Sequence, residues 1–239
     1  MQPDLAFALE LADAADAITL SRFRAHDLRV ETKPDLTPVS EADRAVEAAL
    51  RERIERERPG EAILGEEQGG EGGGWIVDPI DATKNYVRGI PLFATLIALD
   101  GRVAVVSAPA LGKRWWAAKG EGAFADGEPI RVSAVARVED AVLTFTSLKG
   151  QGDGFFGLAA RAWAARGFGD FWQYMLLAEG AVDLCVEAEA NHWDLAAPKL
   201  IVEEAGGRLT DLRGVDTAAG GDCLASNGVL HAEALAALG

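Results

Sequence analysis

The feature that most constrains this chain is a short apolar run that leads directly into two carboxylates and a hydroxyl. The run at 75–77 is followed by the segment DPIDATKN at 78–85. Pro79 fixes its own φ and disfavours a helical conformation at Asp78, so we expect the strand to end in a sharp turn there. Asp81 is then placed as the N-cap of a following helix. The segment therefore predicts a strand, a turn and a helix start in succession.

The same segment offers ligands for a metal and for a phosphate. Asp78 and Asp81, with the carbonyl of Ile80 between them, supply hard oxygen ligands of the kind that Mg²⁺ prefers. The free N–H groups of Ala82 and Thr83 at a helix start suit a phosphate oxygen. A purely structural interpretation is also open, because aspartate is common as an N-cap and in turns. The string alone does not choose between the two.

Two further carboxylates stand at comparable places in the chain. Glu66 follows the apolar segment 62–64, which predicts a short buried strand, and Asp194 stands at a predicted helix start among apolar neighbours. The alternatives are a solvated loop charge for Glu66 and an N-cap for Asp194. Because Glu66 is close in sequence to Asp78 and Asp81, we interpret it as a third metal carboxylate.

The rest of the pattern predicts helices first, then an antiparallel meander, then a mixed second half. In order, the expected elements are a helix over 4–24, a helix from Ser40 to Pro59, strands at 94–99, 103–107, 114–118 and 142–146, helices at 155–166 and 174–180, a strand at 182–186 and a helix at 193–205. We divide the chain into an N-terminal α+β half, 1–130, with most predicted metal ligands, and a C-terminal α/β half, 131–239, that completes the metal and substrate sites.

Charge and composition exclude several functional classes. The formal net charge of −15 over 239 residues disfavours nucleic acid and anionic membranes as partners. In so acidic a protein a phosphate site needs local cations, and bound Mg²⁺ would supply them. The two cysteines lie outside any C-x-x-C unit and no apolar run approaches the length of a membrane span, so we expect a cytoplasmic protein. Neither a G-x-S-x-G nor a P-loop motif is present, so a serine hydrolase or a P-loop enzyme is unsupported.

Four motifs together resemble the inositol monophosphatase family of Mg²⁺-dependent phosphatases. They are KPDLTPVSEAD at 33–43, GEE at 65–67, DPIDATKN at 78–85 and WDLAA at 193–197, and the match covers nearly the whole chain. The resemblance implies an α/β fold of the α+β type, a layered αβαβα sandwich. It also implies a small phosphate ester as substrate, two or three Mg²⁺ ions per active site and a homodimer.

The resemblance also implies a role for each candidate residue. The implied metal ligands are Glu66, Asp78, the carbonyl of Ile80, Asp81 and Asp194. Thr83, hydrogen-bonded to Asp35, would activate the attacking water together with Glu66. Ala82, Thr83 and Asp194 are implied as substrate contacts. The family usually has glycine at position 82, and we expect alanine to fit there at the negative φ of a helix start.

The substrate is the more difficult inference. The family's chemistry is metal-assisted displacement by water, without a protein nucleophile. The strings GDFWQY at 169–174 and AEGAVD at 178–183 look like the histidinol-phosphatase branch of the family. In that branch Asp170 and Glu187 would complement the ammonium and imidazole of histidinol phosphate, unless they are solvated loop acids.

We therefore expect a histidinol-phosphatase of histidine biosynthesis. The first alternative is an inositol-1-monophosphatase or a broad sugar-phosphate phosphatase. The second, of another class, is a catalytically idle member of the family that acts as a binding protein. Intact carboxylates at all four predicted metal positions argue against the idle alternative.

Overall fold

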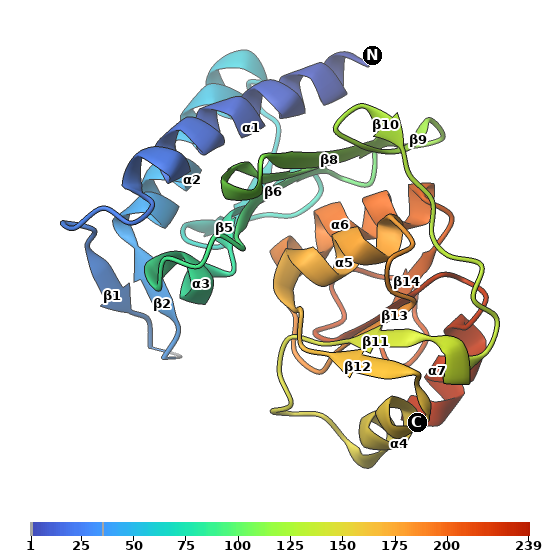
Figure 1. Ribbon diagram of the computed structural model, residues 1–239. Helices are drawn as coiled ribbons and strands as arrows, with labels where there is room; N and C mark the ends of the chain where they lie inside the picture. The colour runs from blue at the N-terminus through green and yellow to red at the C-terminus, as the bar shows by residue number, and fades with distance from the viewer. Residues whose placement is uncertain (1, 35) are drawn as a thin grey trace.

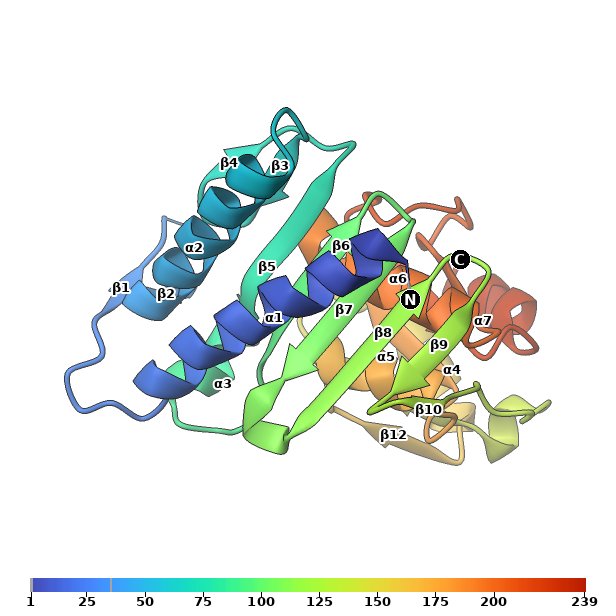
Figure 2. The same cartoon turned by 90° about the horizontal axis from the view of Figure 1, so that it is seen from above.

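The computed structural model describes residues 2–34 and 36–239, and it stacks two β-sheets between three layers of helices (Figure 1). Helices α1 (Pro3–Arg22) and α2 (Glu41–Glu57) lie side by side across the outer face of the first sheet (Figure 2). Helices α5 (Asp170–Ala178) and α6 (His192–Glu204) lie between the sheets, and α4 (Asp153–Arg161) and α7 (His231–Leu238) cover the far face of the second. The predicted αβαβα layering is confirmed.

The first sheet has eight strands in the order β10-β9-β8-β7-β6-β5-β3-β4. They are β3 (Ile63–Gly65), β4 (Gly69–Gly70), β5 (Trp75–Asp81), β6 (Ala94–Leu99), β7 (Val103–Ala108), β8 (Lys113–Ala118), β9 (Gly122–Ala125) and β10 (Glu128–Pro129). From β5 to β10 each strand pairs antiparallel with the next, so the predicted meander is confirmed. Two short strands, β1 (Val30–Thr32) and β2 (Pro38–Ser40), form a separate hairpin before α2.

The second sheet has five strands in the order β12-β11-β13-β15-β14. They are β11 (Val142–Thr144), β12 (Ala164–Arg166), β13 (Leu184–Glu187), β14 (Arg208–Thr210) and β15 (Cys223–Ser226). Short helices complete the described elements: α3 (Thr83–Val87), η1 (Pro109–Leu111) and η2 (Val138–Asp140). All strands of the first sheet precede residue 131 and those of the second follow it, and the division into two halves stays a prediction.

Apolar clusters between the layers hold the fold together. One joins the outer face of the first sheet to α1 and α2, with Trp75 fully buried beside Phe7 at a ring distance of 5.4 Å. The largest lies between the sheets around α5 and α6, and the third packs α4 and α7 on the second sheet. None of the described helices has the length and apolar character needed to cross a membrane.

One predicted helix is too long. The helix expected over 155–166 ends at Arg161, and Ala164–Arg166 instead forms β12, which pairs in parallel with β11. Alanine favours a helix over a strand, and here the pairing with β11 overrides that local preference. The short strands β14 and β15 carried too little local pattern to be predicted.

Candidate active site

A cavity of about 450 Å³ opens where β5 ends, and its lining comes from the β1–β2 region, from the first sheet and from the N-terminal ends of α3, α5 and α6. It is lined by Lys33, Thr37, Pro38, Glu66, Asp78, Ile80, Asp81, Ala82, Thr83, Lys84, Asp170, Asn191, Trp193 and Asp194. This set contains every predicted site residue except Asp35, which lies outside the described residues, and Glu187, which lines an adjoining pocket. The fold thus brings together residues that are more than a hundred positions apart.

The strand β5 does not end in the turn that we predicted at Asp78. It continues through Asp81 with Pro79 inside it, and all seven of its residues are buried. Its pairing with β6 shifts register between Asp78 and Asp81. Proline cannot donate a hydrogen bond to the ladder, and a bulge of this kind accommodates it. The bulge lets Asp78 and Asp81 both contribute to the cavity.

Three carboxylates converge in the cavity. Asp78, Asp81 and Asp194 each offer one oxygen, and these oxygens lie within 4.8 Å of one another. Asp78 is only 2% exposed, and its Oδ1 has no hydrogen-bond partner in the described part of the chain. Burial, and then the charges of Glu66 and Asp81, raise the pKa of Asp78 well above its ordinary value. A buried carboxylate without a partner is costly, and a divalent cation with oxygen ligands removes that cost, so the residues fit a metal ion.

The other two members of the cluster have one oxygen engaged by the backbone. Asp81 Oδ2 accepts a hydrogen bond of 2.6 Å from the Phe171 N–H, and Asp194 Oδ2 accepts one of 2.7 Å from the Asn191 N–H. Asp194 thereby completes the capping box of α6, so capping and participation in the cluster are compatible. Burial raises the pKa of Asp194 to about 6 even though the Asn191 hydrogen bond lowers it.

Glu66 lies in the same cavity but is engaged by a lysine. Lys33 Nζ is 2.8 Å from Glu66 Oε1 and 2.5 Å from Glu67 Oε1. Glu66 is not one of the three carboxylates whose oxygens lie within 4.8 Å, although its charge acts on Asp78. Its role as a metal ligand stays a prediction.

Thr83 has a hydrogen-bond partner that the sequence analysis missed. The Thr83 hydroxyl lies 2.9 Å from the carbonyl of Ile80 and 3.2 Å from Asp43 Oδ1. Asp43 is fully buried, and its other oxygen accepts the Ser40 N–H at 2.8 Å in the capping box of α2. The complete burial of Asp43 is a tertiary property that the local sequence does not encode. The expected bond from Thr83 to Asp35 stays a prediction.

The backbone at Ala82 differs from our expectation. Ala82 has φ 64° and ψ 44°, in the left-handed region, and it, not Asp81, is the N-cap of α3. The expected negative φ is wrong because the chain must leave a bulged strand and enter a helix within one residue. Since α3 has only five residues, its dipole is also weaker than a long helix would provide. The phosphate contacts of Ala82 and Thr83 stay predictions.

We expect Ala82→Gly to increase the free energy of unfolding by about 1 kcal/mol. An L-residue pays about 1–2 kcal/mol in the left-handed region, and the added freedom of glycine in the unfolded chain offsets part of the gain. Denaturant unfolding of the metal-free protein measures the change. The control is Ala48→Gly on the exposed face of α2, where glycine should cost about 1 kcal/mol. A loss of stability in both variants would contradict the assignment of strain to Ala82.

A smaller acidic pocket of about 80 Å³ adjoins the main cavity and shares Asp81, Asp170 and Asp194 with it. Glu187 lines it and is 6% exposed. Its Oε1 accepts hydrogen bonds from the Thr146 N–H at 3.0 Å, the Thr146 hydroxyl and the Gln173 amide. Burial raises the pKa of Glu187 to about 7, and these hydrogen bonds lower it in part.

Asp170 differs from Glu187 in being available to a ligand. Its backbone has φ 49°, and its N–H donates to the Thr146 hydroxyl at 2.9 Å. No described residue donates a hydrogen bond to the Asp170 carboxylate. Burial raises the pKa of Asp170, while the charge of Lys84 lowers it. The pocket therefore presents one engaged carboxylate and one that can receive a cation.

Comparison with known proteins extends these observations. Residues 1–239 match the inositol monophosphatase family model. The chain is 53% identical to a histidinol-phosphatase of Mycobacterium tuberculosis, covering 98% of this chain and 97% of that protein. It is 51% identical to a histidinol-phosphatase of Streptomyces coelicolor, with 97% and 95% covered. A solved IMPase of Thermotoga maritima superposes with a TM-score of 0.89 at 33% identity, covering 99% and 97% of the two chains.

Proposed function

This chain belongs to the inositol monophosphatase family and is a phosphatase, and from that premise we propose that it hydrolyses histidinol phosphate to histidinol and inorganic phosphate with Mg²⁺. The observation that carries the substrate assignment is the acidic pocket beside the carboxylate cluster, in which Asp170 is free to receive a cation. Histidinol phosphate carries an ammonium and an imidazole, whereas inositol phosphates carry no cationic group. The high identity to two histidinol-phosphatases supports the same assignment.

Asp78, Asp81 and Asp194 would hold the metal, together with Glu66 and the carbonyl of Ile80. Mg²⁺, when bound, supplies positive charge to the phosphoryl and leaving oxygens and makes water more acidic. The number of ions, two or three, belongs to the proposal.

The protein's own part in the reaction is to orient water and hold the substrate. The Thr83 proton faces Asp43 Oδ1 and the Ile80 carbonyl, so the lone pairs of its hydroxyl remain to accept a hydrogen bond from water. Glu66 is our candidate to receive a proton from that water. Asp170 would pair with the ammonium of the substrate and hold its phosphate end toward the carboxylate cluster.

Phosphate release from a panel of esters tests the proposal. We expect kcat/KM with Mg²⁺ to be at least about ten-fold higher on histidinol phosphate than on inositol 1-phosphate or glycerol phosphate, equivalent to about 1.4 kcal/mol. Removal of the metal with EDTA should abolish release from all three. Equal or greater activity on inositol 1-phosphate would favour the alternative of a sugar-phosphate phosphatase.

Metal binding should also change how stability depends on pH. Folded, metal-free protein has a pKa of about 6 at Asp194 and values raised well above the ordinary one at Asp78 and Asp81, mainly because of burial. The unfolded chain titrates near pH 4, so between pH 4 and the raised values the folded state binds more protons. Its stability therefore falls as the pH rises through the folded pKa values.

We accordingly expect Tm in EDTA to be several degrees lower at pH 8 than at pH 5.5. Mg²⁺ should raise Tm more at pH 8, because it binds the ionised carboxylates. Thermal melts with and without Mg²⁺ at the two pH values measure both effects. The change in Tm on adding Mg²⁺ is then compared between the two pH values, so that the pH dependence contributed by groups outside the cluster cancels. The same stabilisation by Mg²⁺ at both pH values would argue against binding at this cluster.

We further propose that the protein forms a homodimer. Several large apolar side chains around α4 and β12 are exposed: Leu148 at 56%, Phe156 at 48%, Trp163 at 73% and Phe168 at 42%. Exposed aromatic groups of this kind mark protein interfaces. Light scattering of wild-type protein and of Trp163→Glu tests the proposal, and a monomeric wild type would overturn it.

A further inference from the structure

Lys33 places a positive charge among the candidate metal ligands. It follows β1, and its ammonium lies between the carboxylates of Glu66 and Glu67 at 2.8 Å and 2.5 Å. The three side chains are shielded, with exposures of 19%, 21% and 7%. Burial lowers the pKa of Lys33, but the two carboxylates raise it by more, so its charge persists at neutral pH.

The two carboxylates that Lys33 contacts are not equivalent. Glu66 lines the cavity that contains Asp78, whereas Glu67 is not among the residues that line it. The Glu67 N–H donates at 2.6 Å to Glu47, a fully buried carboxylate that also accepts from Arg51 at 2.9 Å. This anchored backbone keeps Glu67 in place beside the lysine. Lys33 therefore has a fixed second partner if it loses Glu66.

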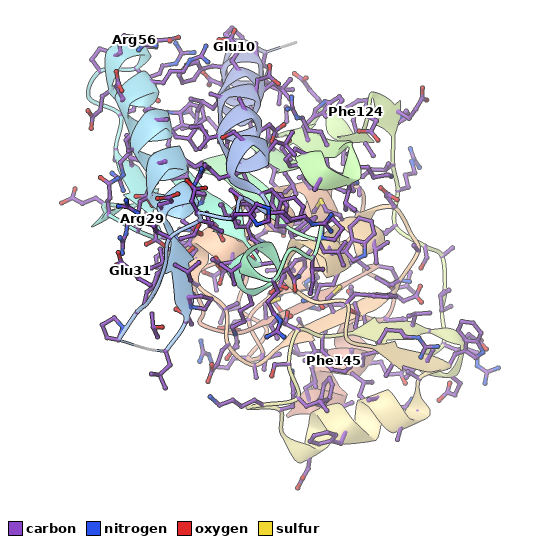
Figure 3. All side chains as sticks on the ribbon, turned by 60° about the vertical axis from the view of Figure 1, so that its left-hand side comes forward. Glu10, Arg29, Glu31, Arg56, Phe124 and Phe145 are labelled. Carbon is purple, nitrogen blue, oxygen red and sulfur yellow. The ribbon has the colours of Figure 1, made fainter. Side chains whose placement is uncertain are left out.

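The segment that carries Lys33 is an exposed strand, held by its pairing with β2, by the Lys33 N–H that donates to the Thr37 carbonyl at 2.8 Å and by the Glu31–Arg44 ion pair. All three residues of β1 are exposed, and the β1–β2 hairpin projects from the body of the molecule (Figure 1). Glu31, in the middle of β1, and Arg29, which precedes β1, lie at the edge of the molecule (Figure 3). The Lys33 ammonium stands on a flexible four-carbon side chain, so it can shift by side-chain rotation while the hairpin stays paired.

We propose that Lys33 is an internal competitor for the cation at Glu66: its ammonium neutralises this carboxylate in the metal-free protein and moves to Glu67 alone when a divalent ion binds. The proposal rests on the metal site of the proposed function. The proposal explains why a lysine is hydrogen-bonded to a predicted metal ligand. An ammonium that stayed at Glu66 would repel the metal ion. Metal affinity is then lower than the carboxylates alone would give.

Titration calorimetry with Mg²⁺ is the first test. We expect Lys33→Met to bind Mg²⁺ about ten-fold more tightly than wild type, because the ion no longer has to displace a charged hydrogen-bond donor from Glu66. Lys33→Arg keeps the competing cation and should stay near wild type. The control is Lys84→Met, which removes a charge from the same cavity at a residue with no hydrogen bond to a described carboxylate. If Lys84→Met increased the Mg²⁺ affinity as much as Lys33→Met, the gain would come from removing any positive charge near the cavity. That result would overturn the proposal.

Lysine ammonium NMR gives a readout independent of affinity and activity. The chain has six lysines, so the Lys33 signal can be assigned by its absence in Lys33→Met. We expect Mg²⁺ to shift the Lys33 signal at the same concentrations that saturate the calorimetric titration. Saturable Mg²⁺ binding with an unchanged Lys33 signal would overturn the competition and leave the metal site intact. No Mg²⁺ binding by any variant would instead refute the proposed function itself.

Discussion

Asp78→Asn is expected to lower the rate of phosphate release by about 10³-fold or more and to leave the protein folded. The cluster contains a buried carboxylate oxygen without a partner in the described chain, and its charge is what a cation would bind. Loss of several kcal/mol of transition-state stabilisation corresponds to a change of this size. Steady-state assays at saturating Mg²⁺, with circular dichroism of the same samples, measure the two effects.

Stability separates this interpretation from simple damage to the fold. In EDTA, Asp78→Asn should raise Tm, because it removes one of several like charges that repel one another in a buried site. Asp183 is a matched control: it is 4% exposed, and its carboxylate accepts from the Val142 N–H at 2.7 Å and from the Ser133 hydroxyl. Asp183→Asn should lower Tm and preserve the activity of the folded protein. Near-normal turnover of folded Asp78→Asn would remove the basis for a metal site here.

Asp170→Asn is expected to reduce kcat/KM on histidinol phosphate by an amount equivalent to about 2–5 kcal/mol and to affect glycerol phosphate much less. The variant leaves the ammonium of the substrate without its partner, whereas glycerol phosphate has no ammonium to lose. Asparagine is suited to the positive φ of 49° at this position, so the backbone should be retained. The ratio of kcat/KM on the two esters is the quantity to compare.

Glu187→Gln provides the contrast, since the Glu187 carboxylate is already engaged by Thr146 and Gln173. This variant should disturb the junction of β11 and α5 and impair both esters to a similar degree. If Asp170→Asn also impairs both equally, then Asp170 supports the neighbouring Asp81 rather than the substrate. The histidinol assignment would then rest on similarity alone.

The parts of the fold that follow from local pattern were predictable. Strand 94–99 was predicted with the bounds it has, because it is a short apolar run ended by an Asp-Gly turn. The carboxylates at 66, 78, 81 and 194 were predicted because each lies in a motif that resembles the inositol monophosphatase family, and the structure brings all four to one cavity.

The missed features depend on tertiary structure. The partner of Thr83, Asp43, lies on a different helix, and its burial is set by packing that no local pattern encodes. The positive φ of Ala82 follows from the bulge in β5, which in turn requires the register of β6. Lys33 follows the first strand of a hairpin whose strands are only three residues long, and its partner Glu66 lies more than thirty positions later in the chain.

The separation of the cluster along the chain has a consequence during synthesis. Asp78 and Asp81 belong to the first sheet, whereas Asp194 begins a helix that is made more than a hundred residues later. A nascent chain that has emerged only as far as the first sheet therefore carries an incomplete carboxylate set. The proposed metal site would therefore be complete only when the last third of the polypeptide has folded back onto β5.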